Sequence, residues 1–292
     1  MSGPNVQSVD MRDPDAARNF ATSIHETGFA ILGNHPVDAT LLHRINREWR
    51  AFFASDDKFN YQIERHPDGR QDGYFSLAVS ERAVGQDVKD IKEFFHAAPD
   101  GPMPETLRAD VIEYRSQALA LGRLLLGWLQ AALPAGCLND PSVNLANVLD
   151  DEPSVLRILH YPPLSGDEPA GSVRAAAHED INFITLLPVA LEPGLQVKTL
   201  EGSWLDLHGE SGEIIVNTGD MLQEMTDGYL PSTTHRVVNP SGSVGNISRI
   251  SMPFFLAPEL SLRLSQRYTA GEYLAERLTE IDGKRDTESD DS

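Results

Sequence analysis

Apolar residues in the first half of the chain recur at intervals of three and four, which is the spacing of one helix face. Between about Pro104 and Leu133 they fall at Val111, Tyr114, Ala118, Leu121, Leu125, Trp128 and Ala132. This pattern predicts a long amphipathic helix with one buried stripe. Helices are also predicted from about Asp13 to Thr27 and from Asp38 to Phe53, with a short buried strand over 28–33 between them.

The pattern changes after Pro153, where short apolar runs alternate with turn-forming residues such as Glu192-Pro-Gly194 and Asn239-Pro-Ser-Gly242. Closely spaced strands of this kind predict a β-sandwich or jelly roll. Helix returns near 270–281. We therefore expect an α+β chain with a mainly β core, folded as one unit over 1–292. Within it, 1–150 is mostly helical, 151–270 forms the jelly roll, and 271–292 forms a C-terminal helix with an acidic tail; residues 56–100 are polar and remain unassigned.

The composition and net charge limit which binding partners and which kinds of metal site we expect. The 292 residues carry a formal net charge of -20, which disfavours nucleic acid and anionic membranes as partners. Cys137 is the only cysteine, so any metal site must use His, Asp or Glu. No apolar run approaches the roughly 20 residues of a membrane span, and the N-terminus lacks the apolar core of a secretion signal. We expect a cytoplasmic protein, whose oligomeric state the sequence does not predict.

Two histidines and one aspartate lie in strand-like runs of the second half. His178 and Asp180 begin a run that continues to Leu187, so alternation along a strand places both on one face. His235 lies in a second such run, 232–238. Ionisable groups inside apolar strands need a partner or a metal. Two imidazoles and one carboxylate make a facial triad that suits Fe(II), and the alternative is three unrelated polar residues.

Arg249 and Ser251, also two apart, follow His235 on another strand-like run. A guanidinium fork and a hydroxyl on one face suit a buried carboxylate, and Tyr161 can add its hydroxyl. The alternative is an edge-strand arginine paired with a surface acid. Arg174 lies four residues before His178, and strand parity places it on the same face. It would bind an acidic group of a substrate or form a structural ion pair.

These motifs, in this order, resemble those of the isopenicillin N synthase-like Fe(II)/2-oxoglutarate oxygenases. The matching segments are 28–35, Asp90-Ile-Lys-Glu93, Tyr161-Pro-Pro163, 178–187, Gly194-Leu-Gln-Val197, Asn217-Thr-Gly-Asp220, Ser232-Thr-Thr-His-Arg-Val237 and Arg249-Ile-Ser251. The resemblance covers nearly the whole chain. Many members have an asparagine two residues before the tyrosine, where this chain has Leu159.

The resemblance implies a distorted double-stranded β-helix, or jelly roll, flanked by helices. It implies iron held by His178, Asp180 and His235, and the distal carboxylate of 2-oxoglutarate held by Arg249, Ser251 and Tyr161. The implied reaction couples decarboxylation of 2-oxoglutarate to oxidation of a small organic substrate by O2, with hydroxylation the commonest outcome and desaturation or cyclisation the others. Ascorbate would support the reaction.

Two alternatives remain open. The first is an Fe(II) oxidase or cyclase of the same fold that does not use 2-oxoglutarate, in which Arg249 and Ser251 grip the carboxylate of the substrate itself. The second is a non-catalytic jelly roll that binds a small molecule.

Overall fold

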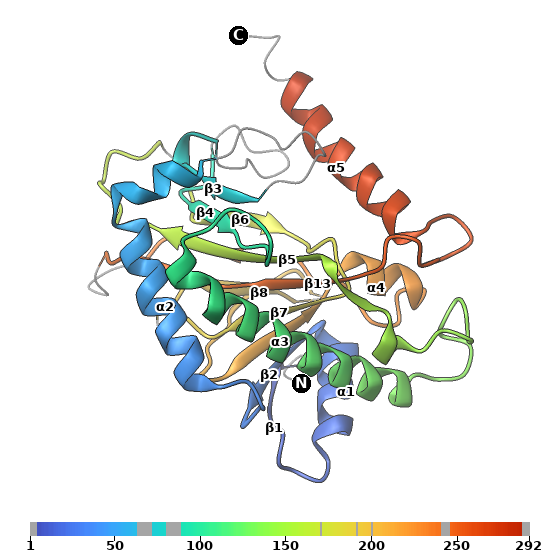
Figure 1. Cartoon of the computed structure of the whole chain (residues 1–292). Coiled ribbons are helices and arrows are strands. Elements are labelled where there is room, and N and C mark those ends of the chain that lie inside the picture. Colours follow the sequence, from blue (N-terminus) through green and yellow to red (C-terminus); the bar gives the residue numbers. More distant parts are fainter. Residues whose placement is uncertain are drawn as a thin grey trace.

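Two β-sheets face each other, and helices cover the outer face of the larger sheet (Figure 1). The computed structural model describes residues 5–62, 72–79, 89–169, 171–190, 192–199, 201–240 and 246–287. The sheets stay separate in the described residues and do not close into a barrel. This arrangement confirms the predicted jelly roll with flanking helices.

The larger sheet has the strand order β1-β2-β10-β7-β13-β5-β4-β3, with β12 paired to the end of β5. Its strands are β1 Gln7–Asp10, β2 Phe29–Gly33, β3 Gly73–Phe75, β4 Glu93–His96, β5 Leu149–Tyr161, β7 Ile184–Pro188, β10 Ile214–Thr218, β12 Arg249–Ser251 and β13 Phe254–Pro258. The smaller sheet has the order β6-β11-β8-β9. Its strands are β6 Ala175–His178, β8 Leu195–Lys198, β9 Trp204–Asp206 and β11 His235–Val237.

Alternation along the strands builds two separate apolar clusters. On β2, Phe29 and Ile31 belong to a cluster shared by both sheets, whereas Ala30 and Leu32 belong to the cluster shared with the helices. The first cluster also contains Leu195 and other side chains of the smaller sheet, so it fills the space between the sheets. Successive side chains of a strand point to opposite faces, and each face here has its own apolar partner.

The predicted helices of the first half are present as α1 Ala16–Thr27, α2 Ala39–Phe53 and α3 Glu105–Ala132. The Asp38 side chain caps α2 by accepting a hydrogen bond from the Thr40 amide at 2.8 Å. The helix α3 packs on β5, β7 and β13. A Cβ atom at Gly122 of α3 would lie 2.3 Å from Leu256, so this glycine permits close contact between helix and sheet.

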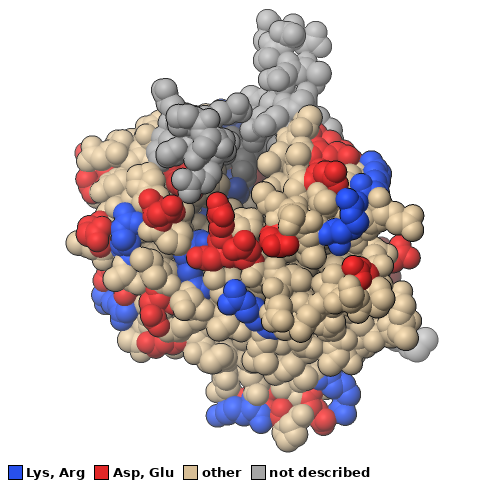
Figure 2. All heavy atoms as spheres, turned by 45° about the vertical axis from the view of Figure 1, so that its right-hand side comes forward, with Lys and Arg blue, Asp and Glu red and all other residues tan. Residues whose placement is uncertain are grey.

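Further helices complete the described chain. They are η1 Asp56–Tyr61, η2 Leu77–Val79, η3 Leu145–Asn147, α4 Asp220–Met225 and α5 Ala270–Thr287. None of the described helices combines the length and apolar character needed to cross a membrane. Acidic and basic side chains are interspersed over the face in Figure 2, and its described residues form no continuous basic area.

The structure differs from the sequence-based expectation in two places. The predicted strand over 28–33 is present as β2, but the first 150 residues also contribute β1, β3 and β4 to the larger sheet, which the sequence did not predict. The run 178–187 is two strands in different sheets, because β6 ends at His178 and β7 begins at Ile184. The end of the predicted acidic tail, 288–292, and parts of the unassigned segment, 63–71 and 80–88, lie outside the described residues.

Candidate active site

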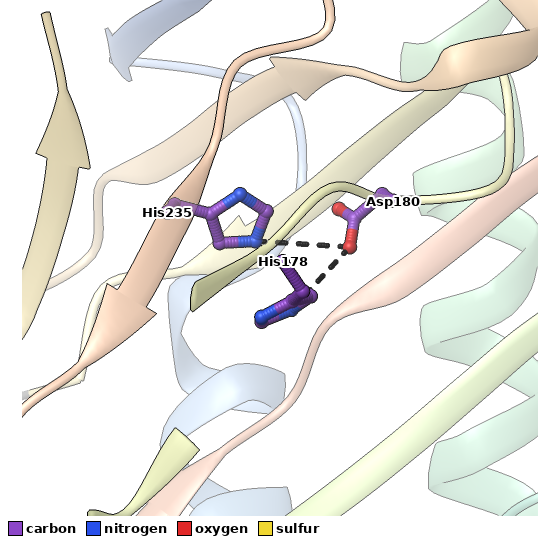
Figure 3. Close-up of side chains that lie close together, drawn as sticks. All are labelled: His178, Asp180 and His235. Atoms are coloured by element: carbon purple, nitrogen blue, oxygen red, sulfur yellow. Dashed lines mark ion pairs between the residues drawn. The ribbon is translucent and has the colours of Figure 1, made fainter. Parts of the chain in front are cut away.

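His178 and His235 are direct neighbours across the antiparallel pair β6–β11. Their ring centroids lie 4.4 Å apart. Each ring turns its Nε2 toward the same oxygen, Oδ1 of Asp180, at 3.8 Å from His178 and 3.7 Å from His235 (Figure 3). Side chains that are far apart in the sequence therefore converge on one point.

Asp180 reaches this position from a loop, so the expectation of one continuous strand is wrong. The loop is held by its backbone: the Asp220 amide donates to the Asp180 carbonyl at 2.8 Å, and the Gly219 amide donates to the Phe183 carbonyl at 2.9 Å. A Cβ atom at Gly219 would lie 2.1 Å from Oδ1 of Asn182 and 2.8 Å from the Asp180 carbonyl oxygen. Only glycine allows the chain 217–220 to press this closely against the Asp180 loop.

Backbone carbonyls orient both imidazole rings. The Nδ1 of His178 lies 2.8 Å from the Ala176 carbonyl, and the Nδ1 of His235 lies 3.1 Å from the Thr233 carbonyl. A carbonyl only accepts, so each Nδ1 carries the proton and donates. In the neutral ring, Nε2 then keeps its lone pair for a metal ion.

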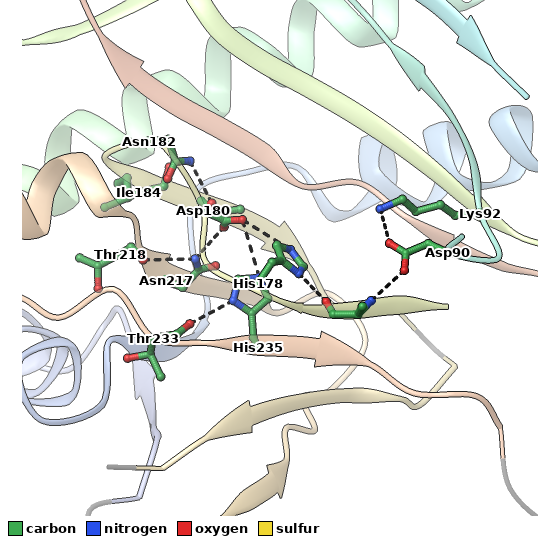
Figure 4. A network of polar contacts seen from close by, with 12 residues as sticks. Asp90, Lys92, His178, Asp180, Asn182, Ile184, Asn217, Thr218, Thr233 and His235 are labelled. Atoms are coloured by element: carbon green, nitrogen blue, oxygen red, sulfur yellow. Dashed lines mark hydrogen bonds and ion pairs between the residues drawn. The ribbon is translucent and has the colours of Figure 1, made fainter. Parts of the chain in front are cut away.

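The Asp180 carboxylate is oriented through its other oxygen, Oδ2. The Thr185 hydroxyl donates to it at 2.5 Å. The Asn217 side-chain amide donates to the same oxygen at 2.8 Å (Figure 4). Sequence analysis did not assign these roles. The signal present was a polar residue on each of two buried strands, Thr185 at 2% exposure and Asn217 at 3%.

The electrostatics favour the protonation states that a metal requires. Burial raises the pKa of Asp180, but nearby His235 and His178 and the hydrogen bonds from Asn217 and Thr185 outweigh burial, so the pKa is lowered. Desolvation of the ring by the surrounding protein and the proximity of His235 lower the pKa of His178, although 44% of its side-chain surface remains exposed. The aspartate is therefore ionised and His178 neutral near pH 7.

A buried ion pair that the sequence did not predict supports β6. Lys92 pairs with Asp90 at 2.8 Å, and the Asp90 carboxylate accepts the Ala176 amide at 3.1 Å. Since the Ala176 carbonyl holds His178, these contacts form a continuous path from Lys92 to the metal-facing ring (Figure 4). Asp90 and Lys92 lie within a segment that the family resemblance marked, and the contact itself depends on the tertiary fold.

The register of β12 on β5 brings the predicted carboxylate anchor together. Arg249 is opposite Tyr161, and Ser251 is opposite Leu159, so all four residues share one face. The guanidinium carbon of Arg249 lies 5.3 Å from the centre of the Tyr161 ring. Arg249 also lines a cavity of about 80 Å³ with Leu187, Leu195, Ile215, His208 and others. The residues lining this cavity do not include the His178–Asp180–His235 group.

Arg174 lies close to this anchor, but strand alternation with His178, on which its predicted position depended, does not place it there. The pairing of β6 with β11 shifts register between His235 and Val237, which interrupts the alternation between Arg174 and His178. Arg174 precedes β6 at a bend. Its guanidinium carbon lies 5.8 Å from the Tyr161 ring centre. It is therefore near the anchor, and the described residues give it no carboxylate partner at ion-pair distance.

His160 has a structural role beside the anchor. Its Nδ1 lies 2.6 Å from Glu93, and its Nε2 lies 2.8 Å from the Ser248 hydroxyl. Ser248 immediately precedes the anchor residue Arg249. His160 therefore connects the interior of β4 and β5 to the start of β12.

The donor set fits one divalent ion. One ligand atom each from His178, Asp180 and His235 lies within 4.8 Å of the others. Two imidazoles and one carboxylate on one side of an ion leave positions open on the other side, which is the arrangement of non-haem Fe(II) oxygenases. The chemistry of the donors and their fixed orientation thus match Fe(II).

Comparisons with known proteins agree with this chemistry. Residues 152–258 match the 2OG-Fe(II) oxygenase superfamily, and residues 5–117 match the N-terminal region of non-haem dioxygenases in morphine synthesis. An oxygenase structure from Shewanella oneidensis is 47% identical, with a TM-score of 0.84 over 95% of this chain and 99% of that chain. A 2OG-Fe(II) oxygenase family structure from Caulobacter crescentus is 30% identical, with a TM-score of 0.78 over 95% and 99%. Gibberellin 2-beta-dioxygenase 1 from Arabidopsis thaliana is 27% identical over 89% of this chain and 80% of that enzyme.

Proposed function

Because the chain belongs to the 2OG-Fe(II) oxygenase superfamily, as its resemblance to isopenicillin N synthase-like enzymes predicted, we propose that His178, Asp180 and His235 hold its ferrous ion. The convergence of two Nε2 atoms on one carboxylate oxygen carries this assignment. Carbonyl acceptors behind both rings and two donors behind the carboxylate give the three ligands one fixed orientation.

The protein is an enzyme of this class and uses Fe(II), 2-oxoglutarate and O2. When bound, the iron supplies O2 activation coupled to decarboxylation of 2-oxoglutarate. The part of the protein in this chemistry is to fix the ligands and to position the co-substrate. Asp180 contributes one negative charge, and two neutral imidazoles complete the set without adding charge.

We assign the distal carboxylate of 2-oxoglutarate to Arg249, Ser251 and Tyr161. The cross-strand pairing of Arg249 with Tyr161 and the burial of all three side chains, at 2–5% exposure, support this assignment. A guanidinium buried in protein binds a carboxylate more strongly than it would in water, because the local dielectric is low.

We further propose that the oxidised substrate is a small organic molecule and that its C–H bond is hydroxylated. The complete set of three metal ligands favours an enzyme that oxidises its substrate over a non-catalytic protein that only binds a small molecule. His178, Asp180 and His235 would hold a ferrous ion, which would supply oxidising chemistry that a protein without a metal lacks. We expect the substrate pocket to draw on residues 56–100, on the region near Arg174 and on the C-terminal region. Of the first of these, 63–71 and 80–88 lie outside the described residues.

The test is Fe(II)-dependent conversion of 2-oxoglutarate to succinate, measured across a panel of small organic molecules with ascorbate present. The wild type should release succinate, and a true substrate should increase the rate and gain one oxygen atom in its mass. Asp180→Ala should abolish both, whereas Asp206→Ala, an exposed aspartate on β9, should leave both unchanged. Full activity of Asp180→Ala would overturn the ligand assignment, and a product lighter by two hydrogens would replace hydroxylation with desaturation.

A further inference from the structure

Two buried guanidiniums lie at the anchor, where the proposed function requires only one. Arg174 is 1% exposed and Arg249 is 3% exposed. Arg174 donates to the Ile247 carbonyl at 2.9 Å, and Arg249 donates to the Glu192 carbonyl at 3.1 Å. Each also keeps a buried nitrogen without a partner, Nε in Arg174 and Nη1 in Arg249.

Both cations face the same aromatic ring. Their guanidinium carbons lie 5.8 Å and 5.3 Å from the centre of Tyr161. Burial and the nearby charge of Arg249 lower the pKa of Arg174. Two like charges in a buried site repel each other, and a fold tolerates them where an anion compensates.

The described protein does not itself supply that anion. Glu192 acts on both arginines electrostatically, but its carboxylate is paired with Arg50 at 3.0 Å. No other carboxylate of the described residues forms an ion pair with Arg174 or Arg249 at 4.0 Å or less. A ligand whose negatively charged end lay beside the Tyr161 ring would therefore be close to two cations, each with an unsatisfied buried N–H.

The backbone of the two residues before Arg174 holds it in this position. The Val173 carbonyl accepts the Ile91 amide at 2.9 Å, and the Ser172 carbonyl accepts the Asn239 side chain at 2.7 Å. Its own contact with Ile247 ties it to the segment that leads into β12, two residues before Arg249. The position of the second cation relative to the first is therefore built into the fold.

We propose that Arg174 is a second cationic residue of the co-substrate site, whose charge acts with that of Arg249 on the distal carboxylate of 2-oxoglutarate. This inference rests on the proposed function. Its consequence is selectivity: the site distinguishes 2-oxo acids that carry a distal carboxylate from those that end in a methyl group. Arg174 thereby acts on the co-substrate, in place of the acidic substrate group considered from the sequence.

Calorimetric titration of the iron-loaded protein under anaerobic conditions tests this, with 2-oxoglutarate and 2-oxopentanoate as the two ligands. Arg174→Met should raise the Kd for 2-oxoglutarate by about 10- to 100-fold, the range for a lost charge-assisted contact. It should leave the Kd for 2-oxopentanoate within about twofold, because that ligand has no distal charge. Arg174→Lys, which keeps the charge, should restore most of the affinity.

The matched control is Arg44→Met, which removes one positive charge from the Arg44–Asp110 pair between α2 and α3. It should leave both Kd values unchanged. Should Arg174→Met fail to fold, Arg174→Gln replaces it, because the amide can still donate to the Ile247 carbonyl.

The inference is overturned if the neutral Arg174 variant binds 2-oxoglutarate as tightly as the wild type. It is also overturned if the variant loses affinity equally for both ligands, which would make Arg174 a structural support of the 247–249 segment. In both cases the wild type still binds 2-oxoglutarate, so the proposed function stands. A wild type that binds neither ligand would instead contradict the proposed function itself, and this inference with it.

Discussion

Replacing Thr185 with valine tests whether the Thr185 hydroxyl orients the metal ligand Asp180. The Thr185 hydroxyl donates to Oδ2 of Asp180 at 2.5 Å, and the side chain is 2% exposed. Valine has nearly the same shape, so the change removes the hydroxyl without opening a large cavity. Asn217 then remains as the second donor to the same oxygen.

The size of the effect follows from the charge on the acceptor. A hydrogen bond to a charged group contributes about 1.5–3 kcal/mol. Loss of such support behind a metal ligand weakens metal binding by about 10- to 100-fold, which corresponds to about 1.4–2.8 kcal/mol. The two ranges agree, so we expect the Kd for Fe(II) to rise within them. The metal-free protein should also lose stability, because it contains the same bond.

The assay is anaerobic calorimetric titration with Fe(II), paired with urea unfolding of the metal-free protein. Thr226→Val is the matched control: that hydroxyl is similarly buried, at 1% exposure, and donates to the Leu222 carbonyl at 2.8 Å at the C-terminal end of α4. It should reduce stability without changing the Kd for Fe(II). An unchanged Kd in Thr185→Val, or equal weakening in both variants, would refute the reasoning.

Three further substitutions have distinct expected results. Gly219→Ala places a Cβ atom 2.4 Å from the Asn182 carbonyl oxygen, so we expect a loss of about 1–3 kcal/mol in the free energy of unfolding, measured with urea, together with weakened Fe(II) binding. Normal Fe(II) binding by that variant would show that the close contact does not set the Asp180 loop. Arg249→Met should raise the KM for 2-oxoglutarate by at least about 30-fold, measured by succinate release, because it removes the main charge at the anchor; an unchanged KM would place the co-substrate elsewhere. Burial raises the pKa of Glu93, but its hydrogen bonds with His160, Tyr74 and Lys58 lower the pKa by a larger amount. The pKa of Glu93 in the folded protein therefore lies below the ordinary value of 4.5. The stability it provides is therefore present above about pH 4.5 and lost as the pH falls through the folded pKa, so wild-type stability should fall more steeply below pH 4.5 than that of Glu93→Gln. Parallel pH profiles would contradict this.

Much of the fold follows from local patterns in the sequence. The spacing of apolar residues identified α3, and capping by Asp38 marked the start of α2. The donor types of His178, Asp180 and His235 identified the candidate metal site before any geometry was known. These features were predictable because they depend on residue type and on spacing within one element.

Features that depend on pairing between distant strands were not predictable. Strand parity failed for Asp180 because β6 ends at His178, and it failed for Arg174 because β6 and β11 shift register. The Lys92–Asp90 pair supports His178 only because β6 lies beside it in the fold. Parity is a rule for uninterrupted strands, and functional loops and bulges interrupt them.

The most direct test of the central claim is anomalous X-ray diffraction at the iron absorption edge from crystals of the iron-loaded protein. We predict one strong peak about 2.0–2.2 Å from Nε2 of His178, Nε2 of His235 and Oδ1 of Asp180, the usual range for nitrogen and oxygen ligands of a divalent ion. A peak elsewhere in the protein, or one that lacks any of these three ligands, would contradict the account.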